Sequence, residues 1–582
     1  MKTLFIEHHG KFLSILAVVA FVITLIQYGF YVGNEVIQIL QKFIVAIFIL
    51  FILYQFGRIK YAENRVEYIK SRWIDLLLLI LILIHTFLFI FFPTIYSGFA
   101  GVFQILDLNF FYIVVIQIYI LISLIIKASR EIHIIAEYRI QPAKVFLLSF
   151  LFMILVGTGF LMLPKSSFHR ISFLDALFTS TSAVCVTGLI VVDTATHFTR
   201  LGQLIILGLI QIGGLGVMTI TTFIAIFFAG GLGIKERVLI SDFIEEEKLG
   251  KIKSTLTQII LFTLIIETIG AILFYHGLKN VNMPFGEKVF HSVFHSISAF
   301  CNAGFSTFSN NLMEDYLRNN FITVSTVGTL IILGGLGFGT LSNLFQLSRI
   351  VFKKRIQRVP ILSTQSKIVL ITTFILIILG AILTYAFERN NTLKNLSVEE
   401  IILTSIFQSI TTRTAGFNTL PISEIMIATS LVYIFLMFIG ASPGGTGGGI
   451  KTTTAFISGL AIIEFLKGRN KLEIFKRKIP IEIIHRVYVK IAFSFLLLFL
   501  ALLILTITEN FPFIDLLFEV ISAFGTVGLS RGITFELSDF GKIVIATIMY
   551  IGRVGPITLL TSFTKETVQP KYEYPTEYVS TV

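Results

Sequence analysis

Four short stretches of this chain repeat one pattern of residue types, and each ends in a glycine followed by a bulky apolar residue. The stretches read F-T-S-T-S-A-V-C-V-T-G-L, F-H-S-I-S-A-F-C-N-A-G-F, I-F-Q-S-I-T-T-R-T-A-G-F and F-E-V-I-S-A-F-G-T-V-G-L. Their glycines are Gly188, Gly304, Gly416 and Gly528, about 112 to 116 residues apart. A serine stands six positions earlier in three copies, as Ser182, Ser298 and Ser522, whereas the third copy has Ile410. Such regular spacing indicates internal repeats.

The backbone of these stretches suits the binding of a cation. Glycine adopts backbone conformations that strain other residues, so a row of carbonyl oxygens can face one axis and replace the water around an ion. We therefore predict that four segments form an ion selectivity filter, and we call them the predicted filter loops. They are Val184, Cys185, Val186, Thr187 and Gly188; Phe300, Cys301, Asn302, Ala303 and Gly304; Thr412, Arg413, Thr414, Ala415 and Gly416; and Phe524, Gly525, Thr526, Val527 and Gly528.

The composition is that of a membrane protein with several spans. The 582-residue chain is 55% hydrophobic and 14% charged, and its mean hydropathy is +0.88, which excludes an ordinary soluble globule. The net charge of +12 does not indicate nucleic-acid binding, because the basic residues cluster in short loops between apolar runs, as on the cytoplasmic side of membranes. Cys185 and Cys301 have neither disulfide nor metal spacing, so we expect them to be small buried residues.

Four apolar runs precede the repeats, near residues 13–31, 36–56, 73–94 and 109–128, and each is long enough to cross a bilayer. The first run has no cleavage-like site at its end, which favours an uncleaved span over a signal peptide. The basic loop 58–72 predicts that this loop and the N-terminus are cytoplasmic. Basic residues stand at roughly every third position of 127–139, so a voltage sensor is one alternative for this stretch. Glu131 and Glu137 interrupt them, however, which favours an ordinary charged helix end.

Each repeat is expected to contain an outer helix, a short pore helix, a predicted filter loop and a returning helix. Outer helices are expected near 144–163, 255–276, 366–387 and 486–508, and returning helices near 201–228, 321–347, 425–466 and 539–562. The basic loops that join the repeats should be cytoplasmic, so the predicted filter loops enter from outside. Because lipid cannot satisfy bare backbone, non-helical loops at membrane depth must line water or an ion.

The predicted fold class is an all-α polytopic membrane protein with four tandem helix–pore loop–helix repeats in a pseudo-fourfold ring, and about four extra N-terminal spans. We assign residues 1–138 to an N-terminal transmembrane extension. The repeats occupy 139–232, 233–350, 351–478 and 479–565, and a cytoplasmic tail occupies 566–582.

A carboxylate stands at or just before the start of each expected pore helix. These residues are Asp175, Glu287, Glu399 with Glu400, and Asp515. Negative charge stabilises the positive end of a helix dipole, and the opposite end would then point into the pore and favour a cation. Simple N-terminal capping explains the same residues, and the two interpretations are compatible.

Several longer motifs resemble one transporter family. They are T-S-A-V-C-V-T-G-L-I-V-V-D (181–193), Q-I-G-G-L-G (211–216), G-A-S-P-G-G-T-G-G-G-I-K-T (440–452) and G-R-V-G-P (552–556). With the four loops, they resemble the Trk/Ktr/HKT superfamily of potassium transporters over about residues 140–565, and most closely its Ktr-type membrane subunits. In that family the loop glycines accompany potassium selectivity and a serine at the first loop accompanies sodium permeation, so Gly188 implies potassium.

The resemblance also implies partners and a location. Ktr-type subunits work as homodimers on a cytoplasmic nucleotide-binding ring, so we expect a homodimer, such a ring and surrounding membrane lipid, and no nucleic acid. We expect no cofactor in the chain, potassium as the substrate, and sodium as a candidate activator. The expected location is the cell (plasma) membrane, with both termini cytoplasmic.

A glycine-rich stretch interrupts the third returning segment, which is too long for one span. Its central residues, which we call the glycine-rich segment, are Gly444, Gly445, Thr446, Gly447, Gly448 and Gly449. A phosphate-binding loop is excluded because Ile450 precedes Lys451 where the motif needs lysine directly after glycine. Non-helical backbone at this depth should face a cavity. The resemblance implies an intramembrane gate, and a passive kink is the alternative.

Arg553 lies deep in the last expected helix. An arginine at bilayer depth costs at least about 2.5–3.5 kcal/mol on insertion scales, so it needs a partner or water. The resemblance places it near the gate, and Glu267 is a candidate partner. Separate packing roles for the two residues remain the alternative.

Potassium uptake through a channel-like pore is therefore the predicted function. A sodium-permeable or sodium-coupled relative is the alternative within transport. A secondary transporter of another type would show inverted repeats, whereas these repeats share one orientation. We expect no enzyme activity, because the sequence has no metal cluster, serine–base pair or paired acids on one span.

Overall fold

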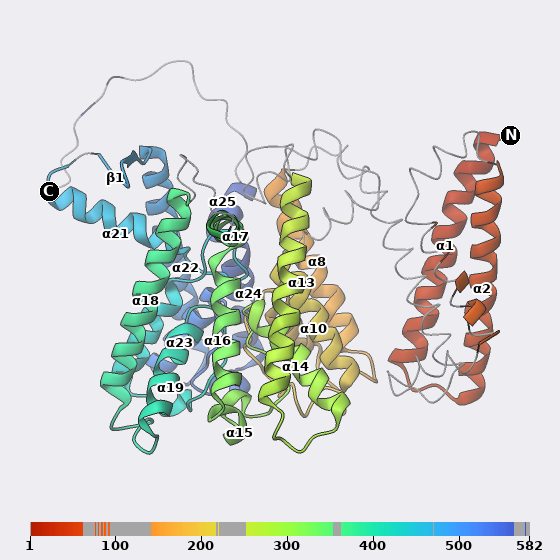
Figure 1. Cartoon of the computed structure of the whole chain (residues 1–582), viewed down its shortest axis with the longest axis horizontal. Coiled ribbons are helices and arrows are strands. Elements are labelled where there is room, and N and C mark those ends of the chain that lie inside the picture. The colour runs from red at the N-terminus through yellow and green to blue at the C-terminus, as the bar shows by residue number, and fades with distance from the viewer. Residues whose placement is uncertain are drawn as a thin grey trace.

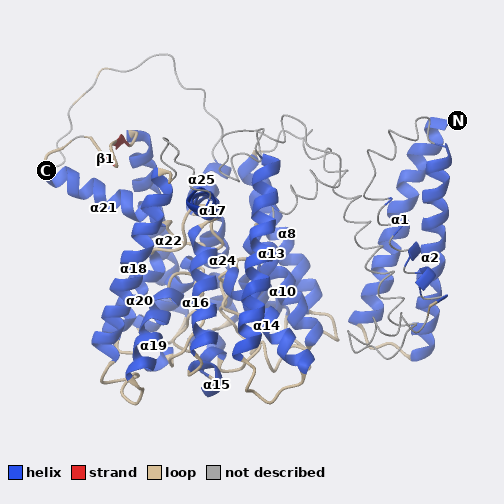
Figure 2. Cartoon of the chain, in the orientation of Figure 1, coloured by secondary structure: helices blue, strands red, loops and turns tan. Residues whose placement is uncertain are grey.

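The computed structural model describes residues 2–61, isolated positions between 76 and 92, 141–216 with 219, 252–352, 362–469, 471–563, and positions 575 and 577. These residues are mostly helical (Figure 2). The described chain also contains one short hairpin, β1 (Glu473–Ile474) with β2 (Arg477–Lys478), so the all-α prediction is wrong in this detail. Phe475 and Lys476 both adopt positive φ in the two-residue turn, which is the geometry that joins strands tightly.

Four long apolar helices occupy the positions expected for outer helices. They are α8 (Pro142–Leu161), α13 (Ile252–Gly277), α18 (Thr364–Glu388) and α22 (Ile481–Thr508), and all four are long and apolar enough to cross a membrane. Each presents large apolar side chains outward, such as Phe152, Ile272, Phe374 and Phe499, which are 62–65% exposed. Side chains of this kind remain exposed where lipid is the solvent. The chain is therefore a multi-pass membrane protein.

A short helix follows each outer helix at the position expected for a pore helix, and we keep the name pore helix for these four. These are α9 (Phe173–Val184), α14 (Phe285–Phe300), α19 (Val398–Thr411) and α23 (Phe513–Gly525). Ser172 caps α9 by accepting a bond from the Asp175 amide at 3.0 Å, and Ser397 forms a capping box with Glu400 at the start of α19. The Glu400 carboxylate accepts a bond from the Ser397 amide at 2.8 Å, so the predicted capping role of a first-turn carboxylate is confirmed for α19, whereas the Asp175 carboxylate accepts the Ser172 hydroxyl instead. Short turns follow the loops: η2 (Asn311–Met313), α15 (Asp315–Arg318), η3 (Ile422–Glu424) and η4 (Ile533–Glu536).

The third returning helix is interrupted at the glycine-rich stretch, as predicted, but the second and fourth are also broken, which was not predicted. The structure has α10 (Arg200–Leu215), α16 (Phe321–Leu336) with α17 (Phe338–Phe352), α20 (Ile427–Phe438) with α21 (Thr452–Leu466), and α24 (Asp539–Val554) with α25 (Pro556–Phe563). The bend is 105° between α16 and α17 and 90° between α24 and α25. Gly216, Gly337 and Gly555 end α10, α16 and α24 with φ of 84°, 85° and 94°. Glycine alone takes this conformation without strain, so a glycine ends each helix.

The N-terminal helices α1 (Lys2–Gly29) and α2 (Asn34–Tyr61) lie together at one end of the molecule (Figure 1). They contact the first repeat beyond α8, where the Lys165 amide donates to Gly29 O at 3.0 Å and Lys165 Nζ donates to Gln27 O at 3.0 Å. The expected spans 73–94 and 109–128 lie outside the described residues except at isolated positions. The charged stretch 127–139, the linker 235–251 and the tail 566–582, apart from positions 575 and 577, also lie outside them.

Candidate functional site

The four loop glycines meet one another in the order of the sequence. A Cβ atom placed on Gly188 would lie 3.1 Å from the Cα of Gly304, and one on Gly304 would lie 3.0 Å from that of Gly416. A Cβ on Gly416 would lie 3.2 Å from the Cα of Gly528, and one on Gly528 would lie 3.0 Å from that of Gly188. The contacts therefore form a closed cycle. At each position a side chain would also press on a carbonyl oxygen of the next loop, so the site requires glycine.

The backbone of all four loops shares one unusual conformation. The glycines have φ of 91°, 70°, 76° and 92° in chain order. Two positions earlier, Val186, Asn302, Thr414 and Thr526 also have positive φ, at 57°, 60°, 82° and 49°. This region strains residues other than glycine, and β-branched ones most. Its recurrence at one position in four loops indicates a constraint that the surrounding structure imposes, because strained backbone clusters at functional sites.

In three of the four loops the non-helical part is shorter than predicted, whereas α19 ends at Thr411, before the third loop begins. Val184 and Phe300 are the last residues of α9 and α14, and Phe524 and Gly525 still belong to α23. Cys185 extends the helical pattern by one residue, since its amide donates to Thr181 O at 2.8 Å. The prediction of five extended residues is thus wrong at the first one or two positions of these three loops. There the helical conformation continues until the positive-φ residue ends it.

Hydroxyl groups in the pore helices hold the loops from within. Ser182 Oγ and Ser522 Oγ accept bonds from the amides of Gly188 and Gly528 at 3.0 and 3.1 Å. In the second loop, Ser298 Oγ donates to the carbonyl that follows the glycine, at 2.8 Å.

The third repeat achieves the same result with a different residue. Thr411 Oγ1 donates to Phe417 O at 2.6 Å, which is the carbonyl that follows Gly416. Ile410, which occupies the aligned serine position, is therefore not a gap in the pattern. The sequence alignment missed Thr411, which stands one position after the aligned serine position. Its hydroxyl group was the signal that could have identified it.

The remaining loop side chains point to different places. Cys185 and Cys301 are buried free thiols, as expected. Arg413 Nη2 donates to Thr373 Oγ1 of α18 at 3.4 Å, and Arg413 lines a small space with Ile331 and Ile377. The guanidinium therefore packs among the helices behind the third loop.

The glycine-rich segment lies in the non-helical stretch 439–451 between α20 and α21. Its backbone bonds to the break between α16 and α17: the Thr446 amide donates to Gly334 O at 3.1 Å, and the Phe338 amide donates to Gly444 O at 3.1 Å. Gly440 donates to Ile450 O at 2.9 Å, which closes the stretch at its base. The segment is thus hydrogen-bonded to the second repeat.

The same segment touches the predicted filter loops. Thr446 Oγ1 donates to Phe300 O at 3.2 Å, and the Gly448 amide donates to Thr526 Oγ1 at 2.8 Å. A Cβ on Gly447 would overlap Thr414 Oγ1. Three of the four loops therefore rest directly on the glycine-rich segment.

Arg553 joins the glycine-rich segment to the end of α10 by donating to backbone carbonyls of both. Its guanidinium donates to Thr446 O and Gly213 O, and to Gly214 O at 3.4 Å. The last carbonyls of a helix lack intrahelical donors and carry partial negative charge, so the end of α10 is a suitable partner for a cation.

Glu267 is not the partner of Arg553, so that prediction is wrong. The Glu267 carboxylate accepts a bond from Gln211 Nε2 of α10 at 3.2 Å. The Glu267 backbone carbonyl accepts from Ser296 Oγ of α14 at 2.6 Å. Glu267 therefore joins its own helix to α10 and α14.

Three of the pore-helix carboxylates also form ion pairs. Asp175 pairs with Lys542 of α24 at 2.7 Å, and Glu287 pairs with Arg200 of α10. Asp515 pairs with Arg531 at 2.5 Å. Each of the first two pairs joins a pore helix to the returning helix of another repeat, a role that the sequence did not reveal.

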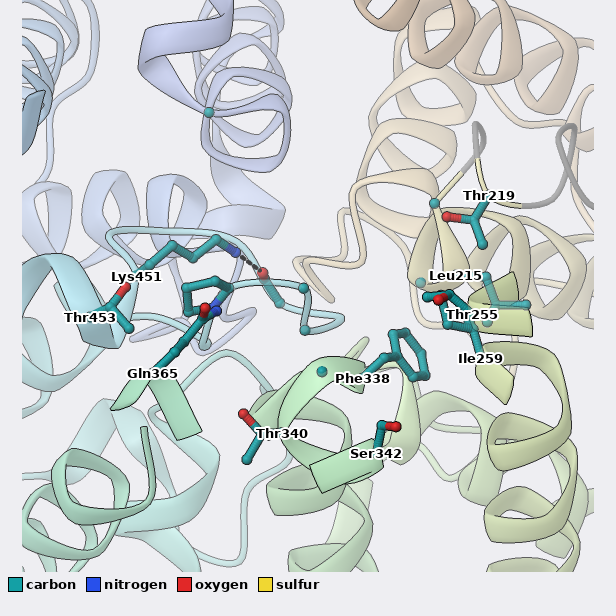
Figure 3. A pocket seen from close by; sticks show the side chains of 18 of the residues that line it. Leu215, Thr219, Thr255, Ile259, Phe338, Thr340, Ser342, Gln365, Lys451 and Thr453 are labelled. Carbon is teal, nitrogen blue, oxygen red and sulfur yellow. Dashed lines mark hydrogen bonds between the residues drawn. The ribbon is translucent and has the colours of Figure 1, made fainter. Parts of the chain in front are cut away.

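A cavity of about 790 Å³ lies beside the glycine-rich segment (Figure 3). Arg553 and the first turns of α13 and α18 also line it, whereas no residue of the predicted filter loops does. At the edge of this cavity, Lys451 Nζ donates to Gly447 O at 2.8 Å (Figure 3). The elements around it, such as α17 and α25, lie at the opposite end of the bundle from α14 and α19 (Figure 1).

Comparison with known proteins identifies the family. A profile described as TrkH, cation transport protein, matches residues 109–574. This chain belongs to the TrkH family of cation transport proteins. The TrkH match begins before residue 138, inside the segment that the sequence analysis placed outside the resemblance.

Relatives and one solved structure cover most of this TrkH family chain. It is 40% identical to Ktr system potassium uptake protein B of Bacillus subtilis, over 76% of this chain and 97% of that protein. It is 35% identical to potassium/sodium uptake protein NtpJ of Enterococcus hirae, over 76% and 97% of the two chains. The crystal structure of the potassium transporter TrkH from Vibrio parahaemolyticus superposes with a TM-score of 0.60 and 17% identity, over 85% of this chain and 98% of that one. The likeness in structure establishes the shared fold.

Proposed function

We propose that this chain takes up potassium through a channel-like pore whose selectivity filter is formed by the four predicted filter loops. The closed cycle of contacts among Gly188, Gly304, Gly416 and Gly528 carries this proposal, because it is what four repeats around one axis require. Positive φ at alternate residues of each loop turns successive carbonyls towards one side, which is the arrangement that replaces the water around an ion. The name of the Bacillus subtilis relative supports potassium as the ion.

The glycine-rich segment is the proposed gate. It rests against the loops and borders the cavity at the other end of the bundle, so a cation leaving the filter meets it next. Arg553 holds it in this position, and its charge opposes a cation in the same passage.

A sodium-permeable transporter is the second candidate. The observation that favours it is the 35% identity to a potassium/sodium uptake protein. Sodium as an activator belongs to the same question, and one flux experiment addresses both.

We also propose a homodimer on a cytoplasmic nucleotide-binding ring. The Bacillus subtilis relative is named as part of a Ktr system, and the basic loops between repeats offer a positive cytoplasmic face. Purification of the tagged chain with native cytosolic proteins should recover such a ring. Complete nucleotide regulation of the isolated chain would contradict this part of the proposal.

The experiment that tests the main function is ion flux into liposomes containing the purified protein, with sodium as a competitor. Gly304→Ser should abolish uptake or lower the potassium-to-sodium ratio, because a Cβ there would lie 2.6 Å from Ala415 O. Gly208→Ser is the matched control, since a Cβ on Gly208 meets nothing within 4 Å. Unchanged rate and ratio in Gly304→Ser would remove that loop from the filter.

A further inference from the structure

In three of the four repeats, a pair of polar side chains joins the pore helix to the segment that follows the predicted filter loop. We call this following segment the exit segment. The pairs, which we call the rear pairs, are His295 with Ser306 (2.9 Å), Gln408 with Thr419 (3.2 Å), and Glu519 with Thr534. All six side chains are buried. The rear pairs therefore lie inside the protein, behind the loops.

The pore-helix members of the rear pairs occupy equivalent positions. His295 and Glu519 stand nine positions before Gly304 and Gly528, and Gln408 stands eight before Gly416. A histidine, an amide and a carboxyl have little in common except that each can bond a hydroxyl. The shared feature is thus the bond between pore helix and exit segment.

The described part of the first repeat, residues 141–216 with 219, has no rear pair. Thr179 stands nine positions before Gly188 and is buried. Among the described residues, neither its hydroxyl nor that of Thr194 in the exit segment has a hydrogen-bond partner. Thr179 therefore supplies an internal comparison, because it has the position of a rear-pair residue without the bond.

Glu519 shows most clearly that the rear pairs are not needed merely to fill space in the protein interior. Its side chain is fully buried, and Thr534 Oγ1, which donates to it, also bonds Ser530 Oγ at 2.8 Å. Ser530 lies two residues after Gly528, so the network reaches the end of the loop. Burying a carboxyl is costly even when it is hydrogen-bonded, and an apolar side chain would fill the space without that cost. What the network adds is a fixed position for the exit segment.

We propose that the rear pairs are positioning residues for ion selection, an inference that rests on the proposed potassium filter. Carbonyl oxygens that face one axis repel one another, so their separation depends on what holds the backbone from behind. A rear pair fixes the end of its loop against the pore helix. The ring of carbonyls then cannot shrink to fit sodium or widen without breaking this bond.

The test uses substitutions that keep shape and remove one hydroxyl. Thr534→Val and Thr419→Val each break a rear pair, and Thr179→Val makes the same change where no pair exists. Initial uptake of potassium and of sodium is measured in liposomes with each purified full-length variant. Both rear-pair variants should lower the potassium-to-sodium ratio about tenfold, which corresponds to roughly 1.4 kcal/mol, and Thr179→Val should leave it unchanged.

Glu519→Gln separates geometry from charge. The glutamine side-chain oxygen can still accept the Thr534 hydroxyl, so the ratio should be retained. If Glu519→Gln alone lowers the ratio, the charge of Glu519 is what matters and the positioning role is overturned. If Thr534→Val fails to fold with an unpaired carboxyl, the double variant Glu519→Met with Thr534→Val replaces the pair with apolar groups and is measured instead.

Two further outcomes would overturn the positioning role, and a third would overturn the proposed function. Folded rear-pair variants with an unchanged ratio, whatever their rate, would show structural support only and overturn the proposal. An equal effect of Thr179→Val would do so as well. Absence of potassium-selective uptake by the unsubstituted protein would instead overturn the proposed function itself.

Discussion

Replacing Arg553 with glutamine should open the proposed gate. The guanidinium donates to Thr446 O in the glycine-rich segment and to Gly213 O at the end of α10. A hydrogen bond to a charged group contributes roughly 1.5–3 kcal/mol net, and the bond to Thr446 is the one that Arg553 makes to the segment. Glutamine is shorter and neutral, so the closed arrangement should lose about 2 kcal/mol relative to an open one.

That energy converts directly into a change of populations. At about 1.4 kcal/mol for each factor of ten, the closed-to-open ratio should fall roughly 30-fold. Loss of the positive charge also lowers the barrier to a cation, and both effects act in the same direction. Initial potassium uptake should therefore rise by up to about 30-fold, and by less if the open fraction is already high.

The assay is initial potassium uptake into liposomes, with the potassium-to-sodium ratio measured in the same preparation. Arg531→Gln is the control, because it also removes a partly buried guanidinium that bonds a backbone carbonyl, Ile425 O at 3.2 Å, outside the proposed gate. The control should destabilise the protein without raising uptake. Unchanged or lower uptake in folded Arg553→Gln would refute the gating role of this side chain.

Shortening the glycine-rich segment is a less selective perturbation than the sequence suggested. From the sequence, shortening Gly444–Gly449 should raise flux and leave selectivity nearly intact. In the structure the Gly448 amide supports Thr526 Oγ1, a side chain of the fourth predicted filter loop, at 2.8 Å. We therefore expect the deletion to raise flux and also to lower the potassium-to-sodium ratio, whereas Arg553→Gln should change the rate alone. Combining the two changes should add little if both act on one barrier.

Three further predictions concern the supports of the site. Thr411→Val should impair potassium selectivity in flux measurements, because it removes the bond to Phe417 O, whereas Ile410→Val should not. Lys542→Met should lower the free energy of unfolding by about 1 kcal/mol through loss of its pair with Asp175, and an unchanged melting temperature would contradict this. Glu267→Gln should leave the uptake rate near that of the unsubstituted protein, because Glu267 does not pair with Arg553; a rise like that of Arg553→Gln would show that the two residues are coupled.

Hydrophobic runs and repeated glycines were sufficient to predict the outer helices, the pore helices and the four loops. The glycine-rich break in the third returning segment was predicted, but the breaks at Gly337 and Gly555 were not, because an apolar run keeps its hydropathy on both sides of a single glycine. A second glycine three positions earlier was the missed signal. A Cβ on Gly334 would overlap Phe300 O, and one on Gly552 would overlap Phe524 O. The second and fourth returning helices thus pack closely on the end of a pore helix just before they break.

Contacts between segments that are distant in the chain could also not be predicted from the sequence. The charge of Arg553 predicted that it needs a partner, but the nearest candidate by type was a carboxylate, Glu267. The actual partners are carbonyls at the end of α10, and helix-end carbonyls become visible as partners only when the end of the helix is known. In the same way, the first-turn acids predicted caps, while the bases that pair with Asp175 and Glu287 come from other repeats.

The helix breaks and the glycine-rich segment form one hydrogen-bonded unit. A broken helix leaves carbonyls without intrahelical donors. The non-helical stretch 439–451 and Arg553 supply the donors: Thr446 N to Gly334 O, Ser442 N to Gly335 O, and Arg553 to Gly213 O. Most of these bonds are between backbone groups, so substitution of side chains leaves them in place. Opening the proposed gate would have to release several of them together, which favours two discrete arrangements over gradual movement. Arg553 is then the point where a single side chain can shift the balance between the two.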